Sequence, residues 1–248
     1  MKRIMKFFAV LALLASPVHA FDIDNMTDEE AASFGDAVRS YLLANPELII
    51  EVIQVLEQQR QVEEVQSDRD MVQSYSDDLF DDGFSHVAGN PDGSIDIVEF
   101  VDYRCGYCRK AHPEVKEIIE ENDQVRLVYK EYPILGEESV IASRFAIATR
   151  MLFGGESYEA MQDALMAFSG SLNEVNLRRL ANALDLDGDA ILAEMTSDAV
   201  SDEINTNRGL GNQMAITGTP TFVLETAMLR GYVPKAQFVQ LIDEMSGE

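Results

Sequence analysis

The sequence IDIVEFVDYRCGYC, residues 95–108, joins an apolar run directly to a closely spaced pair of cysteines. Five of its first seven residues are apolar, which is typical of a strand that is buried on both faces. The turn sequence NPDG, residues 90–93, stands just before the run. The stretch therefore predicts a buried strand that ends a few residues before a CxxC pair.

Cys105 and Cys108 are the two cysteines of this 248-residue chain. A pair so close in sequence forms too small a ring to staple a fold of this size, so its value is chemical: a dithiol and a disulfide that interconvert. The alternative is a zinc site, which needs four ligands, and outside residues 1–20 only His86 and His112 are available to complete it. We interpret the pair as redox-active, with no metal and no cofactor.

The segments around the pair follow a recognisable order. Residues 109–121 are helical in character although Pro113 lies inside them, and residues 124–131 favour a second strand. A CxxC pair at the start of the helix of such a strand–helix–strand unit is the thioredoxin-like arrangement. Residues 137–207 are mostly helical, and residues 221–224, 228–232 and 234–245 predict two strands and a closing helix. The fold class is therefore α/β, with an all-helical insertion.

The first 20 residues have the features of a signal peptide. Lys2, Arg3 and Lys6 precede a short apolar run, and a small-x-small cleavage site ends at Ala20. The run is too short to span a bilayer, although an uncleaved anchor is the alternative. We expect cleavage after Ala20 and export to the periplasm, an oxidising space where disulfides are made and shuffled.

The charge of the chain excludes two classes of partner. The formal net charge is −25, and it becomes −28 once the three cationic residues of the signal peptide are removed. Such a chain repels nucleic acid and anionic lipid. The region around the cysteines is locally basic, since Arg104, Arg109 and Lys110 lie beside them.

Residues 21–75 predict an N-terminal helical segment. Thr27 and Glu30 have the spacing of a capping box, and Asn45-Pro46 interrupts the helical pattern. Apolar residues recur on both sides of the break at helical spacing, so the segment either mediates homo-oligomerisation or packs on its own domain; we expect the former. The acidic residues 66–85 favour a linker or a poorly packed helix end. Residues 76–248 then form the catalytic domain, with the insertion at 137–207.

The position of the pair predicts its chemistry. Cys105 at a helix N-terminus lies near unpaired amides and the positive end of the helix dipole, which lower a thiol pKa. The neighbouring cations add to that field. Cys105, the more exposed sulfur, is therefore expected to attack first, and Cys108 to resolve the mixed disulfide.

Three features make the chain resemble the DsbA family of periplasmic thiol-disulfide oxidoreductases over residues 85–246. They are the apolar strand leading into the CxxC pair, the helical block, and the sequence GTPT at residues 218–221. The resemblance implies that Pro220 is cis and faces the pair, and that Thr219 offers backbone groups to an extended substrate. It also implies that Glu99 is a buried acid that accepts the Cys108 proton through water; a solvent-facing carboxylate at a strand edge is the alternative. His112 is either functional or a plain helix residue.

Two departures from the DsbA pattern favour disulfide isomerase or reductase activity. Gly106-Tyr107 between the cysteines and Thr219 before the proline form the combination found in the dimeric isomerase DsbC. The N-terminal segment is similar to that of the ScsC-like branch of the family. The implied partners are cysteine-containing exported proteins and a membrane redox protein. A DsbA-like oxidase is the first alternative, and a copper- or zinc-handling protein or holdase is an alternative of another class.

Overall fold

The computed structural model describes residues 25–246. Its internal contacts divide the chain into two compact units, residues 1–59 and residues 60–248. The predicted signal peptide lies outside the described residues, and the predicted domain bounds at residues 20 and 75 stay a prediction. Within residues 25–246, no helix is long and apolar enough to cross a membrane.

The described part of the first unit is helical. Helix α1 (Asp28–Ala44) begins with the predicted capping box, since the Glu30 amide donates to Thr27 Oγ1 and the Thr27 amide to Glu30 Oε2. Helix α2 (Glu47–Ser74) begins after Pro46, which confirms the break at Asn45-Pro46. α1 buries no residue. The exposed apolar side chains of this unit include Val38, Tyr41, Leu43, Ile49, Ile50, Val52, Ile53, Val55 and Leu56.

The second unit is built on a five-stranded sheet in the order β1-β3-β2-β4-β5. The strands are β1 (His86–Gly89), β2 (Ile95–Val101), β3 (Val125–Glu131), β4 (Thr221–Leu224) and β5 (Ala227–Arg230). β2 and β3 are parallel and every other pair is antiparallel. The predicted buried strand at residues 95–101 is thus confirmed as the central strand, and β1 is an edge strand that the sequence pattern did not indicate.

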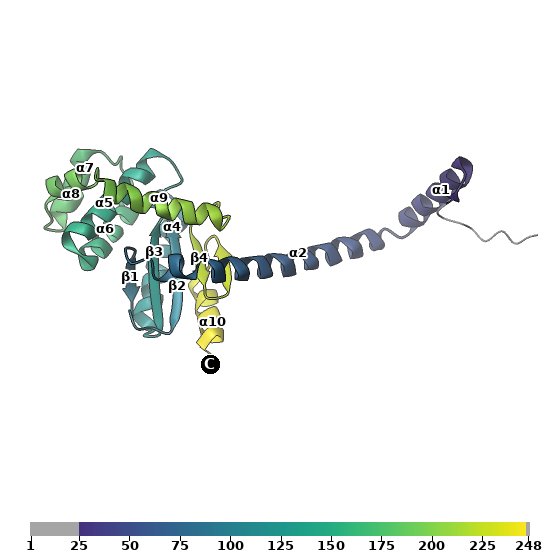
Figure 1. Ribbon diagram of the computed structural model, residues 1–248, viewed down its shortest axis with the longest axis horizontal. Coiled ribbons are helices and arrows are strands. Elements are labelled where there is room, and N and C mark those ends of the chain that lie inside the picture. Colours follow the sequence, from purple (N-terminus) through teal and green to yellow (C-terminus); the bar gives the residue numbers. More distant parts are fainter. Residues whose placement is uncertain (1–24, 247–248) are drawn as a thin grey trace, which may run out of the picture. The chain divides into compact units, whose positions relative to one another are not determined.

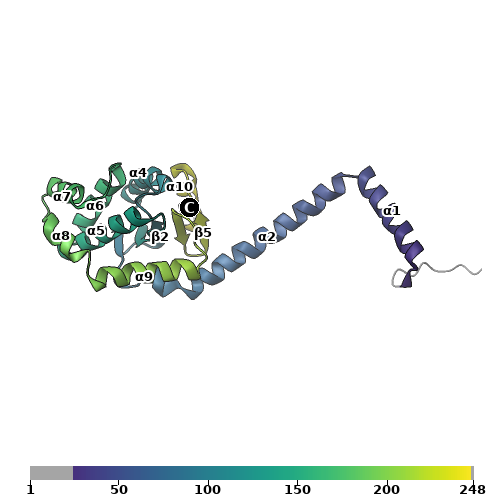
Figure 2. The ribbon, with the colours of Figure 1, turned by 90° about the horizontal axis from the view of Figure 1, so that it is seen from above.

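Helices cover both faces of this sheet (Figure 1). α4 (Gly106–Glu121) and α10 (Lys235–Ser246) lie on one face, where their apolar residues form one core with those of the insertion. The insertion comprises α5 (Glu137–Phe153), α6 (Gly155–Ala167), α7 (Glu174–Ala183), α8 (Gly188–Glu194) and α9 (Asp198–Gln213). α9 leads from this helical block back to the sheet (Figure 2). The structure is the predicted thioredoxin-like fold with an all-helical insertion.

The opposite face of the sheet carries a second core, which includes residues expected to form a linker. α2 continues to Ser74, and α3 (Ser76–Phe80) follows almost at once. Val72 and Leu79 are buried against strand residues of this face. The guanidinium of Arg230 binds both carboxylate oxygens of Asp68, at 2.6 and 2.7 Å. The linker prediction for residues 66–85 is wrong because a few apolar residues at helical spacing reach the sheet while the acids stay paired or exposed.

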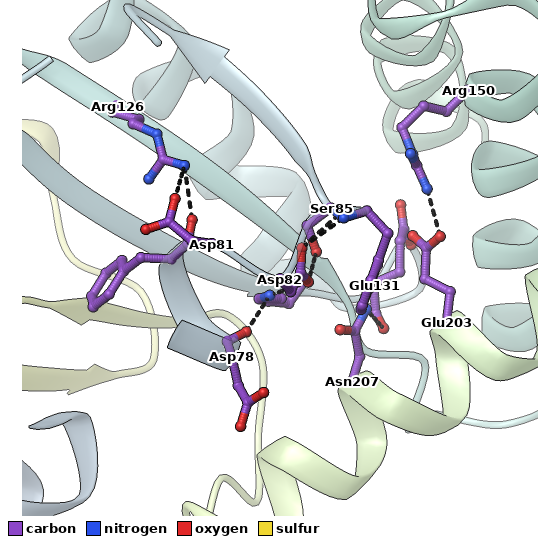
Figure 3. A network of polar contacts seen from close by, with 12 residues as sticks. Asp78, Asp81, Asp82, Ser85, Arg126, Glu131, Arg150, Glu203 and Asn207 are labelled. Carbon is purple, nitrogen blue, oxygen red and sulfur yellow. Dashed lines mark hydrogen bonds and ion pairs between the residues drawn. The ribbon is translucent and has the colours of Figure 1, made fainter. Parts of the chain in front are cut away.

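A buried lysine fixes the segment between α3 and β1. Lys130 Nζ donates to the main-chain oxygen of Asp78 and forms an ion pair with Asp82, which also accepts from Ser85 (Figure 3). Burial lowers the pKa of Lys130, and its contacts with Asp82 oppose that effect. A buried lysine is tolerated when its charge is paired in this way.

Candidate active site

The two cysteines lie where β2 passes into α4. Cys105 is the N-cap residue of α4, and its amide donates to the Asp102 carbonyl at 3.1 Å. Both cysteines are free thiols. Cys105 is 7% exposed, whereas Cys108, one turn into the helix, is fully buried. Of the two sulfurs, Cys105 is therefore the one that solvent or a substrate can approach.

The loop before β4 lies against Cys105. The Thr219–Pro220 peptide bond is cis, and in its thiol form Cys105 donates from Sγ to the Thr219 carbonyl oxygen at 2.9 Å. The Thr219 hydroxyl is buried and makes no hydrogen bond in the described structure. The chain segment 217–221 is thus in direct contact with the reactive sulfur, although more than a hundred residues separate the two in sequence.

The surroundings of Cys105 favour its thiolate. Its pKa is lowered to about 5, first by hydrogen bonding to the Cys108 thiol. The nearby polar side chain of Thr219, although its hydroxyl is not in hydrogen-bonding geometry, and the amides of Cys108 and Tyr107 lower it further, while burial opposes these effects. Because the pKa of Cys105 in the folded protein is below the ordinary thiol value, ionisation of Cys105 stabilises the reduced folded state. This stabilisation is complete above about pH 9. That stabilisation is lost as the pH falls through about 5.

The basic residues near the pair make other contacts. Arg104 and Arg109 donate to the main-chain oxygens of Phe168 and Gly170, in the loop after α6. Lys110 Nζ lies 3.9 Å from the centre of the Tyr232 ring. The donors that lower the Cys105 pKa are neutral, so the two arginines serve instead to hold the insertion against the start of α4.

Cys108 and Glu99 share the buried side of the pair. Burial raises the pKa of Cys108 well above its usual range, and the Cys105 thiol and Glu99 raise it further. Glu99 is fully buried on the central strand, and neither carboxylate oxygen has a hydrogen-bond partner among the described residues. Its pKa is raised to about 8, mainly by burial and then by Glu131 and Cys105. The alternative of a solvent-facing carboxylate at a strand edge is therefore wrong.

His112 faces the insertion rather than the cysteines. Its Nε2 lies 2.6 Å from Asp163 Oδ1 of α6, and Lys116 Nζ lies 2.6 Å from the other oxygen of the same carboxylate. The contact joins α4 to α6. Among residues 25–246, no group of three or more His, Cys, Asp or Glu side chains is placed to hold a metal ion.

Three polar residues next to the site escaped the sequence analysis. Asp102 accepts from the amides of Ile134 and Leu135 at 2.8 and 3.1 Å, which ties the loop before Cys105 to the loop after β3. The Tyr103 hydroxyl donates to Glu131 Oε1 at 2.6 Å, and both residues are buried. Asp102 and Tyr103 stand beside the CxxC pair in sequence, but the position of Glu131 at the end of the second strand carries no such signal.

Thr219→Val is expected to raise the pKa of Cys105 above about 5, toward its ordinary value. The substitution keeps the shape of the side chain but removes a hydroxyl that lowers this pKa. Thiolate absorbance of the reduced protein against pH measures the change, with Thr217→Val, an exposed position in the same loop, as the control. Identical titrations of Thr219→Val and the parent would contradict the assigned role of the hydroxyl.

Family models match two parts of the chain. The DSBA-like thioredoxin domain matches residues 96–243, which include both cysteines and the cis-proline loop. The N-terminal domain of the copper resistance protein ScsC matches residues 30–63. These two matches correspond to the catalytic fold and to the predicted N-terminal helical segment, and they confirm the resemblance to a ScsC-like branch.

Solved structures show a similarity of the same kind, and curated proteins match part of the chain. A thioredoxin-like oxidoreductase from Silicibacter pomeroyi is 39% identical, with a TM-score of 0.64 over 69% of this chain and 98% of the other. BcfH of Salmonella enterica Typhimurium is 26% identical, with a TM-score of 0.73 over 87% of this chain and 96% of the other. Among curated proteins, the Na⁺/H⁺ antiporter NhaA 3 of Salinispora tropica is 29% identical over 137 residues.

The chain spans about a fifth of the length of the first curated relatives that it matches. The similarity to the antiporters covers 55% of this chain, whereas the DSBA-like match covers its sheet, its insertion and its cysteines. The chain therefore belongs to the family of DsbA-like thiol-disulfide oxidoreductases, with an N-terminal segment of the ScsC type.

Proposed function

We propose that this protein is exported to the periplasm and acts on disulfides of exported proteins, as a disulfide isomerase or reductase. The observation that carries the proposal is the asymmetry of the cysteine pair. Cys105 is a thiolate at neutral pH at the surface end of the pair, while Cys108 is buried and protonated. In such a pair one sulfur attacks the substrate, and the other stays protonated until it resolves the mixed disulfide.

In the first step the Cys105 thiolate attacks one sulfur of a substrate disulfide. A bond forms between Cys105 and that sulfur, and the second substrate sulfur leaves as a thiolate that takes a proton from water. We infer that the backbone of Thr219, whose carbonyl oxygen lies 2.9 Å from Cys105 Sγ, pairs with the extended substrate segment. The released thiol can attack another disulfide of the same substrate, which rearranges its bonds.

In the second step Cys108 resolves the mixed disulfide. Its thiol loses its proton to Glu99 through water, and the new thiolate attacks Cys105 Sγ. The substrate sulfur then leaves reduced, and the enzyme is left as a Cys105–Cys108 disulfide that a membrane redox partner reduces. Glu99 suits this role because it is buried beside Cys108 and its pKa of about 8 lies near neutral pH.

Two features favour isomerisation or reduction over oxidation. Gly106-Tyr107 with Thr219-Pro220 is the sequence combination that resembles disulfide isomerases. Residues 25–59 expose a long series of apolar side chains on α1 and the first part of α2. We infer that residues 21–75 mediate homo-oligomerisation, because association between copies of the chain would cover these side chains and bring several active sites together.

The low pKa of Cys105 is the observation that favours a dithiol oxidase as the second candidate. A stabilised thiolate makes the dithiol form more stable and the disulfide form a stronger oxidant. In that case the same two sulfurs catalyse the reverse exchange reaction. The substrate leaves with a new disulfide, and the Cys105–Cys108 disulfide of the enzyme is reduced.

Refolding of a substrate with scrambled disulfides separates the two candidates. We expect the reduced protein to restore the activity of scrambled ribonuclease, since Cys105 opens wrong disulfides and the released thiols find new partners. The control is the oxidised protein mixed with fully reduced ribonuclease. Rapid oxidation of that substrate without recovery of the scrambled one would replace the isomerase proposal by the oxidase.

A further inference from the structure

Glu131 is a second buried carboxylate on the face of the sheet that covers the cysteines. In the parallel pairing of β2 with β3, Glu99 lies opposite Tyr129 and Val101 lies opposite Glu131. Side chains two residues apart in a strand point to the same face, so Glu131 is the diagonal neighbour of Glu99. The spacing between strands and along a strand places their Cα atoms about 8 Å apart.

Two tyrosines hold one oxygen of this carboxylate. The hydroxyls of Tyr103, two residues before Cys105, and of Tyr158, on α6, donate to Glu131 Oε1 at 2.6 and 2.7 Å. Glu131 Oε2 has no hydrogen-bond partner within the described residues. Ser143 of α5 also lowers the Glu131 pKa, although its hydroxyl is not in hydrogen-bonding geometry. Three segments thus converge on one buried acid.

The charged groups around Glu131 come from every neighbouring element. Asp102, which follows β2, raises the pKa of Glu131. Glu203 on α9 is a further buried acid, and Glu131 raises the pKa of Glu203. Arg150 of α5 pairs with Glu203 rather than with Glu131 (Figure 3). Asn207 donates to the main-chain oxygen of Glu131, not to its carboxylate. No cation therefore forms an ion pair with the Glu131 carboxylate in the part of the chain that the structure describes.

We propose that Glu131 is a positioning residue for the resolving step, which acts through Glu99: its buried charge sets how readily Glu99 takes the proton from Cys108. Glu131 is not among the groups that shift the pKa of either sulfur. It lies behind Glu99 on the same face, held in place by the segment that leads into Cys105 and by the insertion. The inference deepens the proposed function and rests on it.

The electrostatics agree with this geometry. Burial raises the Glu131 pKa to about 7, so the group is substantially ionised when the protein works near neutral pH. After burial, Glu131 is the largest influence that raises the Glu99 pKa, to about 8. An ionised Glu131 therefore makes Glu99 the stronger base, at the cost of a smaller ionised fraction.

The test is the lifetime of a mixed disulfide against pH. Mixing the reduced full-length protein with glutathione disulfide forms a disulfide between Cys105 and glutathione and releases one glutathione thiol. Cys108 then attacks Cys105, gives its proton to Glu99, and releases the second glutathione. Acid quenching followed by mass spectrometry, from pH 5 to 9, measures the rate of this second step for the parent and for Glu131→Gln.

We expect the parent rate to rise with a midpoint somewhat below the Glu99 pKa of about 8, because Cys105 raises that pKa in the reduced protein and carries no charge in the mixed disulfide. In Glu131→Gln the midpoint should move down by about one pH unit and the plateau rate should fall, because Glu99 becomes the weaker base. Thiolate absorbance should show an unchanged Cys105 pKa, since Glu131 is not among the groups that shift it. A general disturbance of the fold would change both the pH dependence of the resolving step and the Cys105 titration.

Glu203→Gln is the matched comparison, because it removes a buried acid that repels Glu131 and is not among the groups that shift the Glu99 pKa; its loss favours an ionised Glu131, so the midpoint should not fall. Tyr103→Phe is the second variant should Glu131→Gln fold poorly; it removes a hydrogen bond that lowers the Glu131 pKa, so it should shift the midpoint down by a smaller amount. An unchanged midpoint in both Glu131→Gln and Tyr103→Phe would overturn this inference alone. A parent that forms no mixed disulfide would overturn the proposed function, and the inference with it.

Discussion

Cys105→Ser is expected to abolish thiol-disulfide exchange completely. The serine hydroxyl has no accessible anion at neutral pH, and the remaining sulfur of Cys108 is fully buried and kept protonated. No other cysteine exists in the chain to replace it. Reduction of a model disulfide, followed with a thiol reagent, should fall to the uncatalysed rate.

Cys108→Ser is expected to give the opposite phenotype, an accumulation of trapped intermediates. Cys105 still attacks, because the serine hydroxyl replaces a thiol donor near its sulfur, but no second sulfur can release the substrate. Mixed disulfides between the variant and substrate proteins should appear on non-reducing gels and disappear on reduction. Equal turnover in the two variants would contradict the division of roles between the two sulfurs.

Deleting residues 21–59 is expected to leave a folded, dithiol-active monomer that has lost isomerase activity. The deletion removes the unit that exposes its apolar side chains and keeps the compact unit that begins at Arg60. The deleted protein should still reduce a small disulfide at the parent rate, since Cys105, Cys108 and Thr219 lie far along the chain. Light scattering reports the mass, and recovery of scrambled ribonuclease reports the activity.

The deletion of residues 21–75, which the sequence alone suggests, is the matched comparison. It also removes Val72, which is 1% exposed in the second core, and Asp68, which pairs with Arg230. Loss of the Val72 burial alone costs about 2 kcal/mol. In a domain of this size that lowers the melting temperature by about 4–8 °C relative to the shorter deletion. An unchanged hydrodynamic mass in the shorter deletion would contradict oligomerisation through this segment.

The central part of the fold could be predicted because its signals are local. The apolar run of β2, the turn before it and the helix after Cys105 each follow from neighbouring residues, and parallel pairing follows from their order. Residues 66–85 could not be predicted in the same way. Their acids dominate the composition, whereas their structure depends on Val72, Leu79 and the distant Arg230 and Lys130.

The residues of the site also differ in whether local sequence signals predict them. Cys105, Cys108, Thr219 and Pro220 belong to short motifs that are visible in one pass along the sequence. Glu131 does not, because a carboxylate at the end of a strand is usually solvated, and its burial depends on tyrosines 28 residues before it and 27 residues after it. Such a contact exists only once the insertion has folded over the sheet.

The burial of Cys108 directly behind Cys105 also bears on oxidative damage. A thiolate with a pKa of about 5 is readily oxidised by peroxide to a sulfenic acid, and further oxidation to the sulfinic acid is irreversible. The Cys108 thiol, one helical turn away, can condense with the sulfenic acid, expel water and leave an ordinary disulfide. In a chain without further cysteines, the resolving sulfur therefore also protects the attacking one from permanent inactivation.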